Sequence, residues 1–163
     1  MLCLVKKIMS RIGRLPILLP KDVSVNKDSE NIVVKGPHGV LEREIPSIID
    51  VEILDDRLIV TTKTQSRLSR EFHGLFRTLI NNMVIGVSEK FDKQLELKGV
   101  GYRCQANNNI ITLNLGYSHP IEMKIPDQID VKVENNTSIL VTGIEKEKVC
   151  LLYTSPSPRD RFL

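Results

Sequence analysis

Cysteine is scarce in this sequence, and the three residues present do not form a framework. Cys3, Cys104 and Cys150 lie far apart, with no Cys-x-x-Cys pair and no histidine paired with them. A structural zinc site or a disulfide scaffold needs such spacing, so neither is expected. The default expectation is a protein of a reducing compartment.

Long hydrophobic runs are also missing, because no apolar stretch approaches the roughly 20 residues that a membrane-spanning helix requires. The composition of the 163 residues is that of a globular protein, with 41% hydrophobic and 26% charged residues and a net charge of only +3. The charge is uneven, since residues 1–27 hold six Lys or Arg side chains against the single acid Asp22. Such an arm attracts phosphate backbones or acidic surfaces, although a merely solvated arm explains the charge equally well.

The sequence lacks a recognisable set of catalytic groups. His38, His73 and His119 lie far apart, and each stands beside Gly or Pro, where histidine commonly serves a turn or a cap. Gly99-Val100-Gly101 has neither the third glycine nor the strand–helix context of a nucleotide-binding loop. We therefore expect no enzyme, no cofactor, no metal and no small-molecule substrate.

What the sequence does contain is an internal repeat. Residues 36–53 and residues 116–133 align without a gap at an offset of 80, and seven of the 18 positions are identical. The identical pairs are Gly36/Gly116, Glu42/Glu122, Ile45/Ile125, Pro46/Pro126, Ile49/Ile129, Asp50/Asp130 and Val51/Val131. Self-similarity at a fixed offset predicts a duplicated structural unit, here two tandem small domains over residues 9–89 and 90–148.

The first copy predicts an α+β domain. Short β-branched or alternating runs predict strands at residues 23–25, 32–34, 41–45, 51–53 and 58–62. A helix follows over about residues 66–85, with Ser66 as its N-cap and Gly86 as its stop. Its predicted apolar stripe consists of Leu68, Phe72, Leu75, Phe76, Leu79, Ile80 and Met83.

The second copy repeats the strand pattern from Phe91 but does not repeat the helix. We expect no helix after residue 148, because Pro156 and Pro158 interrupt the chain and no amphipathic pattern is present. Residues 150–160 match one reading frame of a common sequencing adapter, so we interpret residues 149–163 as a non-native tail. At the other end, residues 1–8 are interpreted as an extension or a mis-assigned start before Met9. Without a covering helix, the second domain is expected to be the less stable one.

Two glycine-containing turns of the second copy carry basic and aromatic residues. Residues 97–103 place Lys98, Tyr102 and Arg103 around Gly99 and Gly101, and residues 115–120 place Tyr117, Ser118 and His119 on a tight turn. Loops of this composition suit contact with phosphate and sugar, with aromatic rings free to stack on bases. The alternative is two ordinary hairpin turns whose tyrosines pack on the sheet.

Five motifs in order resemble one protein family. They are residues 9–17, 34–39, 79–87, 95–103 and 113–120. Together with the sequence between them, they make residues 9–149 similar to large-subunit ribosomal protein six, in its bacterial form. The stretches 81–83 and 98–105 look most like cyanobacterial and plastid members. The resemblance implies two similar α+β domains, each a small antiparallel sheet packed on a helix, and no catalysis. The family's basic C-terminal Pro-Tyr-Lys-Gly-Lys-Gly segment is absent.

The resemblance also implies partners and a location. They are large-subunit (23S-type) rRNA near the sarcin–ricin loop and the stalk base, and neighbouring ribosomal proteins, in the plastid stroma or alternatively in a bacterial cytoplasm. The residues expected to contact RNA or a neighbour are Arg11, Arg14, Lys98, Tyr102, Arg103, Tyr117, Ser118 and His119. A competing hypothesis is a protein-interaction module that docks partners on its sheet edges by strand addition.

Overall fold

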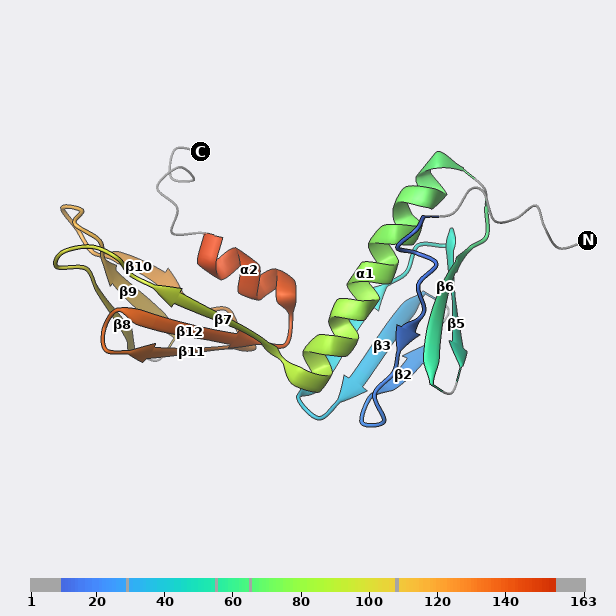
Figure 1. Cartoon of the computed structure of the whole chain (residues 1–163), viewed down its shortest axis with the longest axis horizontal. Coiled ribbons are helices and arrows are strands. Elements are labelled where there is room, and N and C mark those ends of the chain that lie inside the picture. Colours follow the sequence, from blue (N-terminus) through green and yellow to red (C-terminus); the bar gives the residue numbers. More distant parts are fainter. Residues whose placement is uncertain (1–9, 29, 55, 65, 108, 155–163) are drawn as a thin grey trace, which may run out of the picture. The chain divides into compact units, whose positions relative to one another are not determined.

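A computed structural model describes residues 10–28, 30–54, 56–64, 66–107 and 109–154 of the chain (Figure 1). The predicted extension at residues 1–8, and residues 155–163 of the predicted tail, lie outside the described residues. The chain divides into two compact units, Met1–Glu89 and Lys90–Leu163.

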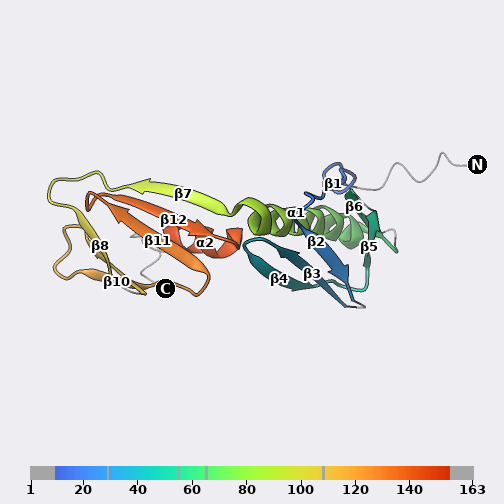
Figure 2. The ribbon, with the colours of Figure 1, turned by 90° about the horizontal axis from the view of Figure 1, so that it is seen from below.

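The first unit contains two three-stranded antiparallel sheets and one long helix. One sheet has the order β2-β3-β4 and the other the order β1-β6-β5, and α1 packs on strands of both (Figure 2). The elements are β1 Ile17–Leu18, β2 Ser24–Lys27, β3 Asn31–Gly36, β4 Gly39–Glu44, β5 Ile49–Leu54, β6 Arg57–Thr62 and α1 Arg67–Glu89. The alternating strands place Ile32, Val34, Leu58 and Val60 in the core, where each is at most 2% exposed.

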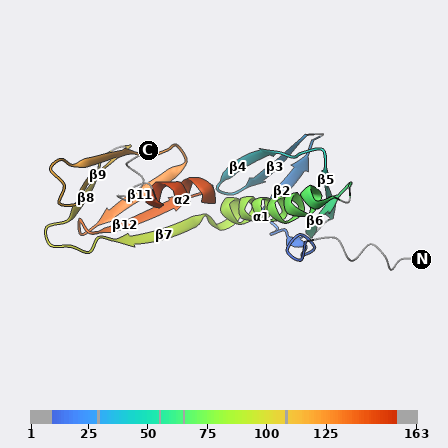
Figure 3. The same ribbon diagram turned by 90° about the horizontal axis from the view of Figure 1, so that it is seen from above.

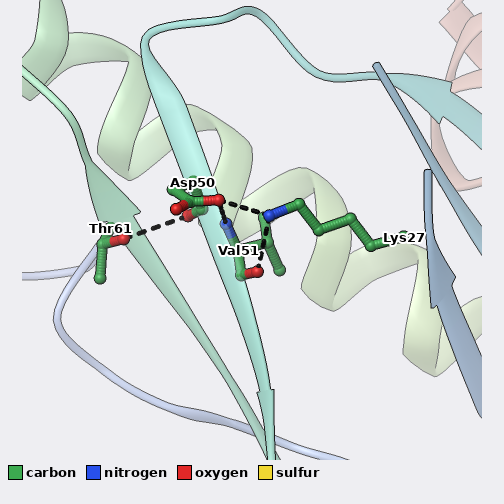
Figure 4. Close-up of polar contacts among 4 residues, drawn as sticks. All are labelled: Lys27, Asp50, Val51 and Thr61. Carbon is green, nitrogen blue, oxygen red and sulfur yellow. Dashed lines mark hydrogen bonds and ion pairs between the residues drawn. The ribbon is translucent and has the colours of Figure 1, made fainter. Parts of the chain in front are cut away.

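A polar contact joins the two sheets of the first unit (Figure 4). The ammonium of Lys27, at the end of β2, forms an ion pair with the Asp50 carboxylate on β5 and donates to the Val51 carbonyl at 3.1 Å. The Asp50 carboxylate also accepts the backbone N–H of Val51 at 3.0 Å. The hydrogen bond from Lys27, followed by that from Val51, lowers the pKa of Asp50 below its ordinary value of 3.8.

Helix α1 begins where the sequence predicted. The Ser66 hydroxyl accepts the backbone N–H of Ser69 at 3.0 Å, which satisfies one of the free donors at the helix start. The predicted end at Gly86 is wrong, because the helix continues to Glu89 and stops at Lys90, whose φ is +62°. A tertiary contact holds the extra turn, since the Val87 carbonyl accepts the backbone N–H of His38 at 3.2 Å.

The buried face of α1 also differs from the predicted stripe. Phe76, Ile80 and Met83 are buried as expected, but Leu68 is 59% exposed and Leu75 is 50% exposed. The core side of the helix is completed by residues that were not on the stripe: Ser69, His73, Val84, Gly86 and Val87. The helix is therefore rotated toward its small and polar residues, which permit close approach to the sheets.

The second unit has the same layers but a much shorter helix (Figure 3). Its sheets have the orders β11-β12-β7 and β10-β9-β8, both antiparallel. The elements are β7 Phe91–Glu96, β8 Arg103–Asn107, β9 Ile110–Asn114, β10 Ile121–Lys124, β11 Ile129–Glu134, β12 Ser138–Gly143 and α2 Lys146–Thr154. The predicted class, tandem α+β domains with sheets packed on helices, is confirmed.

The expectation that the second unit has no helix is wrong. Helix α2 covers nine residues, packs on β7 and β12, and buries Val149 and Leu152 in the core of the unit. An added Cβ on Gly143 would lie 2.6 Å from Val149 Cγ2, so the glycine at the end of β12 lets the helix dock closely. The sequence pattern missed α2 because, among its described side chains, Val149 and Leu152 are the ones buried in the core, which is too few to produce a visible apolar stripe.

Candidate nucleic-acid interface

Two loops of the second unit meet at one end of the β8-β9-β10 sheet. The loop before β8 covers residues 97–102 and the loop between β9 and β10 covers residues 115–120. The register pairs Arg103 with Asn114, and Leu113 with Ile121, so both loops leave the sheet at the same end. The structure thus brings together six of the eight sequence-predicted residues: Lys98, Tyr102, Arg103, Tyr117, Ser118 and His119. We call residues 97–103 and 115–120 the loop cluster.

The side chains of the loop cluster differ in how much of them is accessible. Lys98, Arg103, Ser118 and His119 are exposed. The Tyr117 residue is 46% exposed, whereas Tyr102 is half-buried. At the tip between the two glycines, Val100 is fully exposed.

The local charge of the loop cluster includes one surface ion pair. Lys98 Nζ lies 3.3 Å from Glu96 Oε2, and the two side chains are 82% and 66% exposed. An ion pair between such exposed groups contributes little, about 0.2–1 kcal/mol. A phosphate group can therefore replace Glu96 as the partner of Lys98 at small cost.

A third turn lies against the loop cluster and was not predicted as part of the site. The turn between β11 and β12 contains Asn135 and Asn136, both with positive φ (+53° and +57°). Its backbone carbonyls hold the chain on both sides of the first loop. Leu97 N donates to Thr137 O and Cys104 N donates to Asn136 O, each at 2.8 Å. Two consecutive asparagines between alternating runs are a signal for such a turn. Its place beside the loop cluster depends on strand pairing, which that signal does not give.

The remaining two predicted residues, Arg11 and Arg14, belong to the first unit. Both are exposed on the turn that precedes β1, where Arg14 N donates to Ser10 O at 3.3 Å. This turn docks on α1 through two contacts.

The first contact is between Gly13 and the buried ring of His73 on α1, which a Cβ on Gly13 would overlap. The His73 ring is itself held by a hydrogen bond of 2.9 Å between its Nε2 and Val60 O. In the second contact, Arg77 Nε on α1 donates to Leu15 O at 3.1 Å. His73 is thus a core residue of a helix, not a turn or cap residue as expected.

The described part of the chain holds neither a cluster of metal-ligating side chains nor a helix that could span a membrane. Within residues 10–154, apart from the four single-residue gaps, no three His, Cys, Asp or Glu side chains come together as metal ligands would. Over the same residues, neither helix is long and apolar enough to cross a membrane. Cys104 is buried, and this burial raises the pKa of its thiol. A reactive cysteine needs the opposite environment.

The fold defines the chain as a protein of two repeated α+β units, the second of which carries basic and aromatic loops at one sheet end. Comparison with known proteins gives the family. The family model "Ribosomal protein L6" matches residues 19–90 and 98–160. The chain is 52% identical over 139 residues to the large ribosomal subunit protein uL6 of Synechocystis sp., which covers 85% of this chain and 78% of that protein.

Plastid-type relatives give the same result. The chain is 53% identical over 139 residues to the uL6c protein of Phaeodactylum tricornutum, which is 85% of this chain and 78% of that protein. It is 50% identical over 141 residues to the uL6c protein of Pyropia yezoensis, which is 86% of this chain and 78% of that protein. The chain belongs to the ribosomal protein L6 family. This is a family of structural ribosomal proteins and not of enzymes.

Proposed function

We propose that the chain is a structural constituent of the large ribosomal subunit that binds 23S-type rRNA near the sarcin–ricin loop and the stalk base. The matched relatives are large ribosomal subunit proteins, and they come from cyanobacteria and from algae with uL6c proteins. We place the chain in the plastid stroma on this basis, with a bacterial cytoplasm as the alternative. Its partners are the rRNA and neighbouring proteins of that subunit.

The loop cluster is the observation that carries this proposal. Lys98 and Arg103 would contact phosphate, Ser118 and His119 would bond to sugar or phosphate oxygens, and the exposed ring of Tyr117 would stack on a base. Arg11 and Arg14, on the turn docked to α1, would form a second basic contact.

The salt dependence of RNA binding tests the role of the two basic side chains, Lys98 and Arg103. Each phosphate contact that is lost reduces the slope of log K against log salt by about 0.7–0.9. We expect Lys98→Ala/Arg103→Ala to reduce the slope of binding to an rRNA fragment with the sarcin–ricin loop and stalk base by about 1.4–1.8. Filter binding between low and high salt measures it.

The matched control removes two charges elsewhere in the same unit. Lys124 stands at the opposite end of β10, paired with Ile110, and Lys132 lies in the middle of β11. Lys124→Ala/Lys132→Ala should leave the slope within about 0.5 of the unchanged chain. Equal slopes for the two double variants, or salt-independent binding, would contradict the proposal. A ribonuclease-resistant complex with other proteins and no rRNA affinity would favour the sheet-edge interaction module instead.

A further inference from the structure

We infer that Tyr102 is a positioning residue that holds the two loops of the loop cluster together, and that Tyr117 is the ring presented to RNA. The part concerning RNA depends on the function proposed above, whereas the positioning role does not. Both tyrosines were expected to contact RNA or a neighbour from their sequence context. The structure gives them different surroundings.

The ring of Tyr102 packs against two glycines, one in each loop of the loop cluster. A Cβ added to Gly99 would lie 2.6 Å from Tyr102 Cδ2 and Cε2 and 2.8 Å from Cζ. A Cβ added to Gly116 would lie 3.5 Å from Cε1, at one edge of the same ring. The ring therefore packs one face on its own loop and turns an edge toward the loop that follows β9.

Both glycines are required by this packing for separate reasons. At Gly99 there is no room for a side chain against the ring. At Gly116 the ring is within ordinary contact distance, and the backbone has φ +78°, which favours glycine. The ring thus connects two loops that are separated in the sequence by residues 103–114 and are joined elsewhere by the β8–β9 pairing.

Fixing this ring also fixes the residues proposed to bind RNA. Arg103 directly follows Tyr102 at the start of β8, and Tyr117 directly follows Gly116. The Tyr117 residue is 46% exposed, whereas Tyr102 is half-buried, so Tyr117 presents the larger accessible surface. Preorganised contacts bind more tightly because less loop entropy is lost on binding.

The positioning role is tested without RNA by amide hydrogen exchange of the full chain. Tyr102→Ala should speed exchange in residues 115–120 about tenfold, although the substitution lies in the other loop. Tyr102→Phe should leave exchange unchanged, because the contacts are made by ring carbons. Gly99→Ala should reproduce the effect of Tyr102→Ala by displacing the ring.

Val100→Ala is the matched control, since Val100 lies in the same loop and is fully exposed. It should leave exchange in residues 115–120 unchanged. Unchanged exchange of those residues in Tyr102→Ala would overturn the inference. A uniform rise across all strands of the second unit in both Tyr102→Ala and Gly99→Ala would also overturn it, because the ring would then be an ordinary core residue.

Measurements of RNA affinity then distinguish the roles of Tyr102 and Tyr117. Tyr117→Ala should weaken binding of the rRNA fragment by about 5- to 150-fold, the range that loss of one stacked base gives. Tyr102→Phe should bind like the unchanged chain. If Tyr102→Phe bound as weakly as Tyr102→Ala, the hydroxyl would contact RNA directly and the inference would be wrong. If the unchanged chain bound no RNA while the exchange results held, the proposed function alone would fail.

Discussion

The two units of the chain share a strand pattern but end on helices of very different length. Helix α1 has 23 residues and buries five large apolar side chains, Phe76, Ile80, Met83, Val84 and Val87. Helix α2 has nine residues and buries Val149 and Leu152. The sheets of the two units therefore depend on their helices to different degrees.

What the units share follows from the repeat. Ile45 N donates to Glu30 O at 2.6 Å, and Ile125 N donates to Asn109 O at 2.7 Å, so the aligned isoleucines make matching backbone contacts. The aligned acids each form an ion pair with a lysine, but the lysines are at different places in the two units: Asp50 pairs with Lys27 at the end of β2, and Asp130 Oδ2 lies 3.8 Å from the Nζ of Lys90, just before β7. The repeated residues thus maintain the strand framework and not the helices, which lie outside the aligned segments.

The largest expected difference between the units is in stability. Among the described side chains, α1 buries three more large apolar groups than α2. At about 1.5–3 kcal/mol each, these favour the first unit by roughly 5–9 kcal/mol as an upper bound. In a urea series followed by hydrogen exchange, strands β7 to β12 should lose protection before β2 to β6 and α1. A single transition at one urea concentration for both units would contradict the comparison.

A medium effect is expected at the glycines on which the helices dock. A Cβ on Gly36 would overlap Val87 Cγ1 and lie 3.2 Å from the Val87 carbonyl oxygen, whereas a Cβ on Gly143 would be crowded only by Val149 Cγ2 at 2.6 Å. Overpacking of this kind costs about 1–3 kcal/mol. Gly36→Ala and Gly143→Ala should each lower the free energy of unfolding of their unit by this amount.

Shortening the opposing valine distinguishes the two glycine sites. Val149→Ala should recover most of the loss in Gly143→Ala, while Val87→Ala should recover less in Gly36→Ala, because the Val87 carbonyl remains in place. Denaturant unfolding of the single and double variants measures this coupling. Strictly additive losses at both sites would show that the helices do not rest on these glycines.

The smallest effect concerns the carboxylate of Asp50 at low pH. Its pKa is lowered in the folded chain by the hydrogen bonds from Lys27 and Val51, so the stabilisation is present above the unfolded value and is lost as pH falls below about 3.8. In a carbon-13 NMR titration, Lys27→Met should raise the pKa of Asp50 toward its ordinary value. Lys90→Met, the matching change beside Asp130, should leave the Asp50 titration unchanged.

The sequence predicted the strands of the first unit well because their turns are chemically distinct. Alternating runs bounded by Asp, Asn, Ser, Gly and Pro gave β2 to β6 within a few residues, and Ser66 marked the start of α1. The two-residue strand β1 was missed, since Ile17–Leu18 is too short to show a period. Its pairing with β6 depends on the docked turn before it.

The candidate site was predicted in composition but not in geometry. The glycine, tyrosine and basic residues of residues 97–103 and 115–120 were visible in the sequence, but the packing of Tyr102 against the loop glycines Gly99 and Gly116 was not. Nothing in a linear pattern distinguishes that ring from Tyr117. Their different exposure is visible only in the fold, where the β8–β9 pairing brings the two loops to the same end of the sheet.

The sequence by itself determined the duplication, the α+β class and the family resemblance, because these depend on residue types at fixed spacing. Only the tertiary structure decided where α1 ends, which face it buries, that α2 forms, and which tyrosine joins the loops. Each of these depends on a contact between distant residues, such as His38 with Val87 or Gly143 with Val149. Such contacts contribute free energy that local propensity does not contain.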